Sequence, residues 1–184
     1  MKKFIVTTLA IVAVITTFSS CDLLDKADDV TFDVQFKVPT SFEVSEEAEN
    51  PVNPYTSLQS TMDVDNPQYD QYKNKIKDVT INKIEYTISN FSADGPVTLT
   101  SGEAIFFGTG ETIAAGKIAS VTNKALSNHT GELQASAAAL EEIEKIIFED
   151  GEVFVVSRAT LSDAPVFFNV NVTIHATIKA NALD

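Results

Sequence analysis

Few residues in this chain have the chemistry of a catalytic nucleophile, a general base or a soft metal ligand. The sequence holds one cysteine, Cys21, and two histidines, His129 and His175. A nucleophilic site needs a histidine that a third group orients. His129 lies in a polar stretch that we expect to be a loop, and His175 lies on the polar face of the last predicted strand, either exposed or paired across the sheet. The sequence therefore predicts no catalytic residue, no cysteine–histidine zinc site and no cofactor.

Carboxylates are abundant, since 26 residues are Asp or Glu, so paired acids of the kind that hydrolyse glycosides arise by chance. Residues 63–66, Asp-Val-Asp-Asn, begin like a calcium loop. An EF-hand needs glycine at its sixth position and glutamate at its twelfth, where this chain has Gln68 and Asn74. Another kind of calcium site stays open at two acidic groups: Asp63, Asp65 and Asp70, or the run from Glu43 to Glu49.

Aromatic residues that could hold a sugar are limited, because the chain has no tryptophan. Three of its four tyrosines, Tyr55, Tyr69 and Tyr72, fall in one irregular acidic region, residues 40–72. They are the candidate contacts to a partner or ligand. The alternative is that they pack this region onto the sheet.

The first 22 residues have the pattern of an export signal. Lys2 and Lys3 precede an apolar run from Phe4 to Phe18, and the small residues Ser19 and Ser20 follow it. The run is too short for the ~20 residues that a membrane-spanning helix needs, and it suits the apolar region of a secretory signal.

Residues 18–21, Phe-Ser-Ser-Cys, resemble a bacterial lipobox, although Phe18 stands where an aliphatic residue is usual. The Ser-Ser-Cys ending is similar to lipoprotein signals of the Bacteroidota. This resemblance implies cleavage before Cys21 and attachment of lipid chains, palmitate among them, to its sulfur and its freed amine. Two or more chains anchor a protein stably. The alternative is an ordinary signal with a structural cysteine beside it, but Cys21 has no second cysteine to pair with.

Residues 21–29 are predicted as an acidic tether. Acidic residues soon after the lipidated cysteine resemble a surface-export signal of Bacteroidota lipoproteins. We therefore expect the protein to be anchored to the outer membrane of the cell envelope. The sequence leaves open whether the protein lies on the cell-surface side or on the periplasmic side of that membrane.

Charge and length limit the number of domains and the kinds of partner for the part of the chain that follows the signal. Cleavage before Cys21 leaves 164 of the 184 residues, enough for one domain with its own core. Loss of Lys2 and Lys3 takes the formal net charge from −13 to −15. Such a surface repels nucleic acid and anionic lipid headgroups, so we expect no nucleic-acid partner. Without disulfides, the core alone must hold the domain.

Alternation of apolar and polar residues predicts strands through much of residues 30–184. Val30–Val38 alternates strictly, and Pro39 is expected to end it because proline lacks a ladder donor. In Lys77–Phe91 the apolar residues change parity around Asn82 and Lys83, which predicts a β-bulge or a strand that crosses between sheets. The last strand, Pro165–Ala180, alternates most cleanly. Further strands are predicted at Val97–Phe107, with a bulge at Gly102, and at Glu111–Val121 and Glu152–Leu161.

One convincing amphipathic helix is predicted at residues 133–148, with an apolar stripe at helical spacing. Gly151 suits a left-handed position at its end, and we expect the helix to cap an open end of the fold or to bridge two sheets. Within the irregular region, Asn66 and Pro67 predict the start of a short helix over Pro67–Lys75. The rest of that region is expected to be a functional loop or a solvated flap.

Six or seven alternating strands with one helix predict a mainly β fold, an antiparallel β-sandwich that is immunoglobulin-like or similar. The strands after Gly151 loosely resemble the closing strands of late-embryogenesis-abundant type 2 domains, which are small sandwiches. The predicted organisation is a signal over 1–20, a tether over 21–29 and a single sandwich domain over 30–184.

Three function classes remain. The leading hypothesis is a non-enzymatic binding or interaction module of the cell envelope, with an envelope protein or a glycan as partner. The second is a carrier that holds an apolar ligand between its sheets, near Phe106, Phe107, Ile147 and Phe167. The third and least favoured is a carboxylate-dependent hydrolase.

Overall fold

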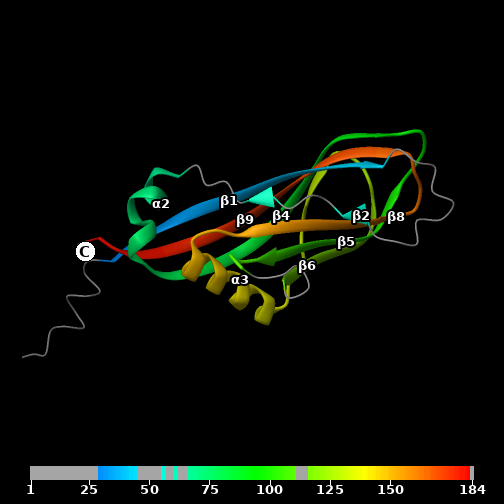
Figure 1. The fold of residues 1–184 in the computed structure, drawn as a ribbon. Helices are drawn as coiled ribbons and strands as arrows, with labels where there is room; N and C mark the ends of the chain where they lie inside the picture. Colours follow the sequence, from blue (N-terminus) through cyan, green and yellow to red (C-terminus); the bar gives the residue numbers. More distant parts are fainter. Residues whose placement is uncertain (1–28, 45–54, 57–59, 62–65, 111–115, 183–184) are drawn as a thin grey trace, which may run out of the picture.

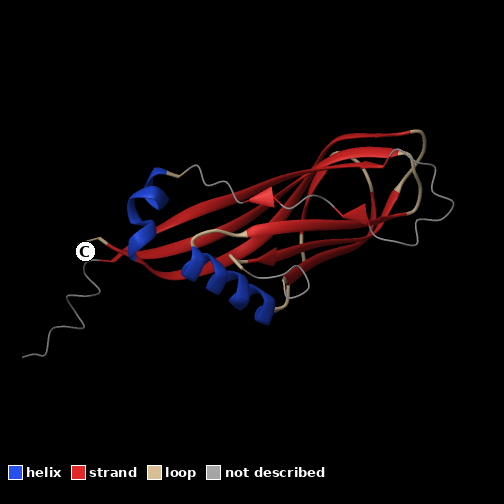
Figure 2. Ribbon diagram, viewed as in Figure 1, coloured by secondary structure: helices blue, strands red, loops and turns tan. Residues whose placement is uncertain are grey.

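A computed structural model of the chain describes residues 29–44, 55–56, 60–61, 66–110 and 116–182. Figures 1 and 2 show a mainly β molecule in which two antiparallel sheets face each other, with two short helices toward one end. The predicted sandwich is confirmed. One sheet, here called sheet A, has the strand order β1-β9-β4-β7, and the other, sheet B, has the order β2-β8-β5-β6 with β3 also paired to β8.

Sheet A contains the three longest strands, β1, β4 and β9. The strands of sheet A are β1 (Asp29–Val44), β4 (Ile76–Ala93), β7 (His129–Glu132) and β9 (Val166–Asn181). Those of sheet B are β2 (Tyr55–Thr56), β3 (Ser60–Thr61), β5 (Thr98–Phe107), β6 (Lys117–Ala125) and β8 (Phe154–Leu161). The helices are α2 (Pro67–Tyr72), a 3-10 turn η1 (Lys73–Lys75) and α3 (Ala137–Asp150).

Strand β9 lies at the centre of sheet A, between β1 and β4. Its residues alternate between buried and half-buried positions for most of its length, from Val172 to Ala180. The apolar set faces the core, so the predicted inward face of the last strand is confirmed.

Pro39 does not end the first strand, contrary to the prediction. β1 continues to Val44, and Pro39 pairs with Asn171 of β9. β1 is an edge strand, and successive residues of a strand direct their backbone groups to opposite sides. The Asp33 carbonyl faces the open edge, because it accepts from the Asn66 side chain. Pro39 has the same parity as Asp33, so its missing N–H costs no ladder bond.

The predicted change of face in β4 is confirmed as a bulge. The register with β9 shifts between Ile81 and Lys83, so Asn82 is the extra residue. Asn82 and Lys83 are consecutive and both exposed, whereas Ile81 and Ile84 are buried on either side. The bulge therefore places two polar side chains side by side on the outer face of sheet A.

Strand β5 also carries an irregularity, but not at Gly102 as predicted. The register with β8 shifts between Leu99 and Ser101. Gly102 is buried, and a Cβ there would lie 2.9 Å from a Leu99 methyl carbon, so the close approach of Leu99 explains the glycine. The strand predicted at Glu111–Val121 is observed as β6, Lys117–Ala125, and residues 111–115 lie outside the described part.

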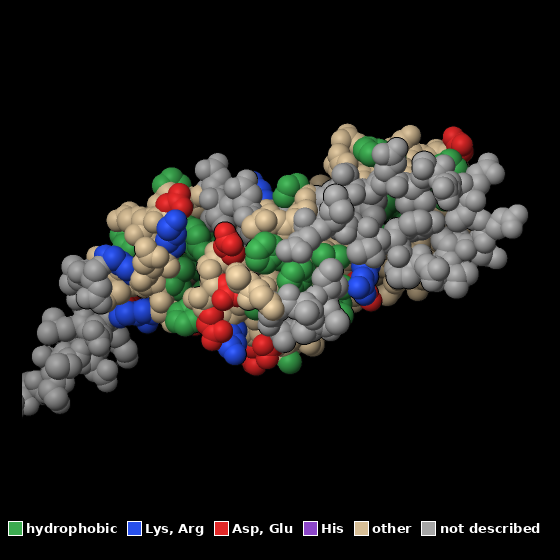
Figure 3. All heavy atoms as spheres, viewed as in Figure 1, with side chains coloured by type: hydrophobic (Ala, Val, Ile, Leu, Met, Phe, Trp, Pro, Cys, Tyr) green, Lys and Arg blue, Asp and Glu red, His purple; other side chains and the backbone are tan. Residues whose placement is uncertain are grey.

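Helix α3 begins later than predicted. Ser136 is its N-cap and its hydroxyl accepts from Ala139 N at 3.2 Å, whereas Leu133 precedes the helix and donates its N–H to Ile84 O at 2.8 Å. Gly151 ends α3 in the left-handed conformation, as predicted. The helix contacts β4 of sheet A and β5 and β6 of sheet B, so it bridges the two sheets. Acidic side chains gather along its exposed face (Figure 3).

Polar residues 129–132 form a strand rather than the expected loop. β7 pairs with residues 85–88 of β4. Just after it, Gln134 exchanges two backbone hydrogen bonds with Ser120 of β6, at 2.7 and 2.8 Å. This segment therefore joins sheet A to sheet B and closes one side of the sandwich.

The region 40–72 is less irregular than predicted, because residues 40–44 extend β1 and residues 67–72 form α2. The predicted start of α2 is confirmed. The Asn66 side chain accepts from Gln68 N at 2.9 Å and from Tyr69 N at 3.2 Å, and its amide donates to Asp33 O. Asn66 thus caps α2 and covers part of the β1 edge.

Glu144 of α3 protects another edge. β7 covers only residues 85–88 of β4, and the Glu144 carboxylate accepts from Ile81 N at 2.7 Å beyond that stretch. We expect Glu144→Ala to lower the free energy of unfolding by about 1–3 kcal/mol, because a part-buried N–H would lose its partner. Chemical denaturation measures this change in the free energy of unfolding. Glu144→Gln keeps an acceptor and should cost less, and Glu141→Ala, at an exposed position of the same helix, should change little. Equal effects of Glu144→Ala and Glu141→Ala would contradict the assignment.

Candidate functional site

The outer face of sheet A carries a polar hollow of about 310 Å³. Five polar side chains from three neighbouring strands line it together with Val34 and Ala176: Asp33, Gln35, Asn82, Lys83 and His175. We call this set the polar hollow. Polar groups that converge on one concave surface are typical of a ligand or partner site.

The sheet register explains why these side chains meet. Gln35 of β1 and Lys83 of β4 both pair with His175 of β9, so the three lie in one row across the sheet. Asp33 pairs with Thr177 in the next row, and the bulge adds Asn82 beside Lys83. No stretch of the sequence contains this set, because it exists only once three strands are aligned.

Hydrogen bonds hold one side of the hollow in place. The Thr177 hydroxyl donates to the Asp33 carboxylate at 2.7 Å, and the Asn82 amide donates to the Thr177 oxygen at 3.0 Å. This chain joins β1, β9 and β4 through their side chains. It fixes the Asp33 oxygens and the Asn82 amide before any ligand arrives.

Glu85 orders the other side. Its carboxylate lies 3.0 Å from Lys83 Nζ and also contacts Nε2 of His175. The Lys83 ammonium, with a smaller contribution from His175, holds the pKa of the Glu85 carboxyl below its usual value of 4.5. Glu85 is therefore ionised at neutral pH and orients Lys83 and His175.

A second ion cluster joins the strand ends of sheet A. Asp29 lies 2.7 Å from Lys179 Nζ and 2.8 Å from Lys77 Nζ, and its side chain is 8% exposed. Lys179 first, and then Lys77, hold the pKa of Asp29 below its usual value of 3.8. The cluster ties the first described residue of β1 to β4 and β9.

Both lowered carboxyl pKa values predict loss of stability in acid. A carboxyl whose pKa is lower in the folded chain stabilises the fold above its unfolded pKa, and this contribution is lost as the pH falls through the folded pKa. We expect Asp29→Asn to lower the free energy of unfolding at pH 7 and to change it less at pH 3. Urea denaturation at both pH values measures the difference. Asp94→Asn, in the exposed β4–β5 turn, is the control, and an Asp29→Asn effect that does not depend on pH would contradict the ion-pair role.

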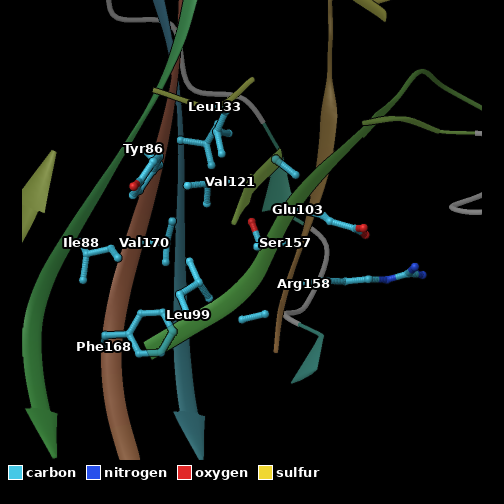
Figure 4. Close-up of a pocket in the computed structure, with 14 residues that line it drawn as sticks. Tyr86, Ile88, Leu99, Glu103, Val121, Leu133, Ser157, Arg158, Phe168 and Val170 are labelled. Carbon is cyan, nitrogen blue, oxygen red and sulfur yellow. The ribbon is translucent and has the colours of Figure 1, made fainter. Parts of the chain in front are cut away.

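The gap between the sheets is small. It measures about 40 Å³ and is lined mainly by apolar side chains of both sheets, among them Ile88, Leu99, Val121, Phe168 and Val170. Figure 4 shows Glu103 and Arg158 pointing away from the other labelled residues. Sites for small molecules measure roughly 300–1,000 Å³, so this gap is a packing defect by size.

Beside this gap, Tyr86 and His129 form a fixed pair. His129 Nδ1 lies 2.7 Å from the Ser127 carbonyl oxygen, which can only accept, so Nδ1 is the donor of this hydrogen bond. Nε2 then accepts from the Tyr86 hydroxyl at 3.2 Å. Burial raises the pKa of Tyr86. The pair fixes the orientation of the Tyr86 ring, and we assign it a role in packing.

The structure does not gather the three candidate tyrosines on one exposed surface. Tyr69 is 5% exposed, packs edge-on against Phe36 and donates its hydroxyl to Gly151 O at 3.2 Å. Tyr72 is half-buried with its ring 6.0 Å from that of Phe32. The backbone of Tyr55 pairs with Ala159, and its side chain is outside the description. Partner or ligand contact at Tyr55, Tyr69 and Tyr72 stays a prediction.

Several other predicted groups fall outside the described residues, namely Cys21, Asp63, Asp65 and the side chains of the Glu43–Glu49 run. Asp70 is exposed on α2. Within the described ranges, no cluster of three Cys, His, Asp or Glu side chains could hold a metal ion. No helix among those same residues is long and apolar enough to cross a membrane.

Comparison with known proteins identifies no family for this chain. No family model and no curated protein matches the chain. Among solved structures, Desmodium yellow mottle tymovirus matches with a TM-score of 0.36 and 11% identity, over 100% of this chain and 94% of that chain. Turnip yellow mosaic virus matches with a TM-score of 0.33 and 11% identity, over 84% and 96%. TM-scores this low carry no argument about either fold or function.

Proposed function

We propose that this protein is a lipid-anchored module of the cell envelope, which binds a polar partner through the polar hollow and catalyses no reaction. The observation that carries this proposal is the hollow itself. It combines a volume of about 310 Å³ with side chains from three strands that Thr177 and Glu85 hold in place. The sequence of residues 1–21 supports the anchor.

The chemistry of Glu85 favours binding over glycoside hydrolysis. A hydrolase needs one carboxylic acid that keeps its proton near neutral pH, which requires a raised pKa. Lys83 shifts the pKa of Glu85 in the opposite direction. Glu85 is therefore suited to orient donors and unsuited to give a proton to a leaving group.

The small inter-sheet gap likewise favours a filled core over an apolar carrier. About 40 Å³ accommodates a water molecule but no acyl chain. Native mass spectrometry of the purified protein tests the carrier directly. A stoichiometric apolar adduct would revive it.

Photocrosslinking in intact cells tests the proposed function. A photoreactive amino acid at Gln35 of the full-length lipoprotein should give a discrete adduct, because this exposed side chain lines the hollow. The same probe at Glu141, on the exposed face of α3, is the matched control and should give none. Absence of an adduct at Gln35, or identical adducts at both positions, would contradict the proposal.

A further inference from the structure

We infer that the polar hollow binds a hydroxyl-rich saccharide unit, an inference that rests on the proposed function and names the chemistry of the partner. A sugar hydroxyl donates one hydrogen bond and accepts others, so a site for it must offer both roles at short range. The hollow does so. Asp33 offers acceptors, Lys83 offers donors, and the amides of Gln35 and Asn82 offer both.

The charges of the hollow disfavour the other small polar ligands. An anion would meet the Asp33 carboxylate, which the Thr177 hydroxyl holds in place, and Glu85 behind Lys83. A cation would meet the Lys83 ammonium, which also lines the hollow. A neutral ligand that is rich in hydroxyl groups avoids both repulsions and can use every polar group of the hollow.

The dimensions and the rigidity of the hollow also suit a sugar ring. A volume of about 310 Å³ is at the lower end for small-molecule sites and fits one or two rings. The Asn82 amide is already bonded to Thr177, and Lys83 is already bonded to Glu85. Binding therefore needs little ordering of these side chains, which lowers its entropic cost.

Saturation-transfer NMR tests the inference on the full-length lipoprotein in detergent. The probes are neutral di- to tetrasaccharides that contain glucose, galactose, mannose or N-acetylglucosamine. At least one probe should bind, and Gln35→Ala and Asn82→Ala should each lower its association constant about fivefold or more, the loss expected for one hydrogen bond. Both residues are exposed, and thermal unfolding verifies that each variant keeps its fold.

Thr130→Ala is the matched control, because Thr130 is an exposed residue of β7 at the far edge of the same sheet. Its association constant should equal that of the unaltered protein. Failure of every probe to bind, or binding that neither hollow variant weakens, would overturn the inference. If the Gln35 crosslink then yields a protein adduct, the saccharide inference fails and the proposed function stands. If Gln35 yields no adduct, both fail.

Discussion

Phe168→Ala is expected to lower the free energy of unfolding by about 3–5 kcal/mol. Phe168 is 1% exposed on the inner face of β9, and it borders the gap of about 40 Å³ between the sheets (Figure 4). Removing the ring would enlarge this gap in the middle of the sandwich, where strands of both sheets restrain collapse. The cost therefore combines lost apolar burial with a persistent cavity.

Urea denaturation followed by circular dichroism measures this loss, and the neighbouring residue is the control. The side chain of Phe167 lies on the opposite face of β9 from that of Phe168, and it is 37% exposed. Phe167→Ala should change the free energy of unfolding by about 1 kcal/mol or less. The losses in the free energy of unfolding at these two adjacent phenylalanines should thus differ severalfold. Similar losses at both positions would show that β9 does not separate a packed face from a solvated face.

Gly131→Ala is expected to lower the free energy of unfolding by about 1–3 kcal/mol, as overpacking of a fixed side chain does. Gly131 of β7 pairs with Tyr86 of β4. A Cβ at residue 131 would lie 2.5 Å from the Tyr86 hydroxyl oxygen and 2.6–2.7 Å from two ring carbons. The ring cannot yield easily, because Tyr86 is 4% exposed and its hydroxyl is bonded to His129.

Thermal and urea unfolding of three variants, with Tyr86→Ala alone as the reference for the third, measure this effect. Gly95→Ala is the glycine control, since a Cβ there would meet nothing within 4 Å, and it should be close to neutral. The third variant places Gly131→Ala in a Tyr86→Ala background, where the penalty should largely disappear because the clash partner is gone. A Gly131→Ala penalty of the same size in both backgrounds would contradict the close packing of Tyr86 on Gly131.

Much of the sandwich could be predicted from period-two alternation. β9 and the bulge in β4 emerge directly, because each depends on which side of one strand a residue faces. The capped ends of the helices could also be predicted, because Asn66 and Gly151 act within a few residues of their own positions. Local rules therefore sufficed wherever a local interaction decides the structure.

The misassigned elements depend on neighbours that the sequence does not name. Pro39 was expected to end β1, but it belongs to an edge strand and its nitrogen faces away from the ladder. Residues 129–132 are polar and short, and they become β7 only because β4 supplies a free edge. Leu133 fits the apolar spacing of α3, yet its N–H is already bonded to Ile84 before the helix begins.

The candidate site was missed for the same reason. The sequence did place His175 on the polar face of the last strand, where it pairs across the sheet with Glu85, as one of the two alternatives expected. It could not reveal that Gln35 and Lys83 share its row, because register between distant strands is set by long-range pairing. The available sign in the sequence was that Gln35, Lys83 and His175 each occupy a polar position of a predicted strand.

Anchoring at Cys21 is the claim on which the proposed envelope location depends, and the mass of the first peptide of the mature chain tests it most directly. The full-length protein would be expressed in a bacterium that processes lipoproteins, recovered from the membrane fraction and digested with trypsin. We predict a first peptide that spans Cys21–Lys26 and carries a diacylglyceryl group on the cysteine sulfur, and we predict that Cys21→Ser abolishes it. A mature chain that retains Phe18–Ser20, or that begins with an unmodified Cys21, would contradict the account.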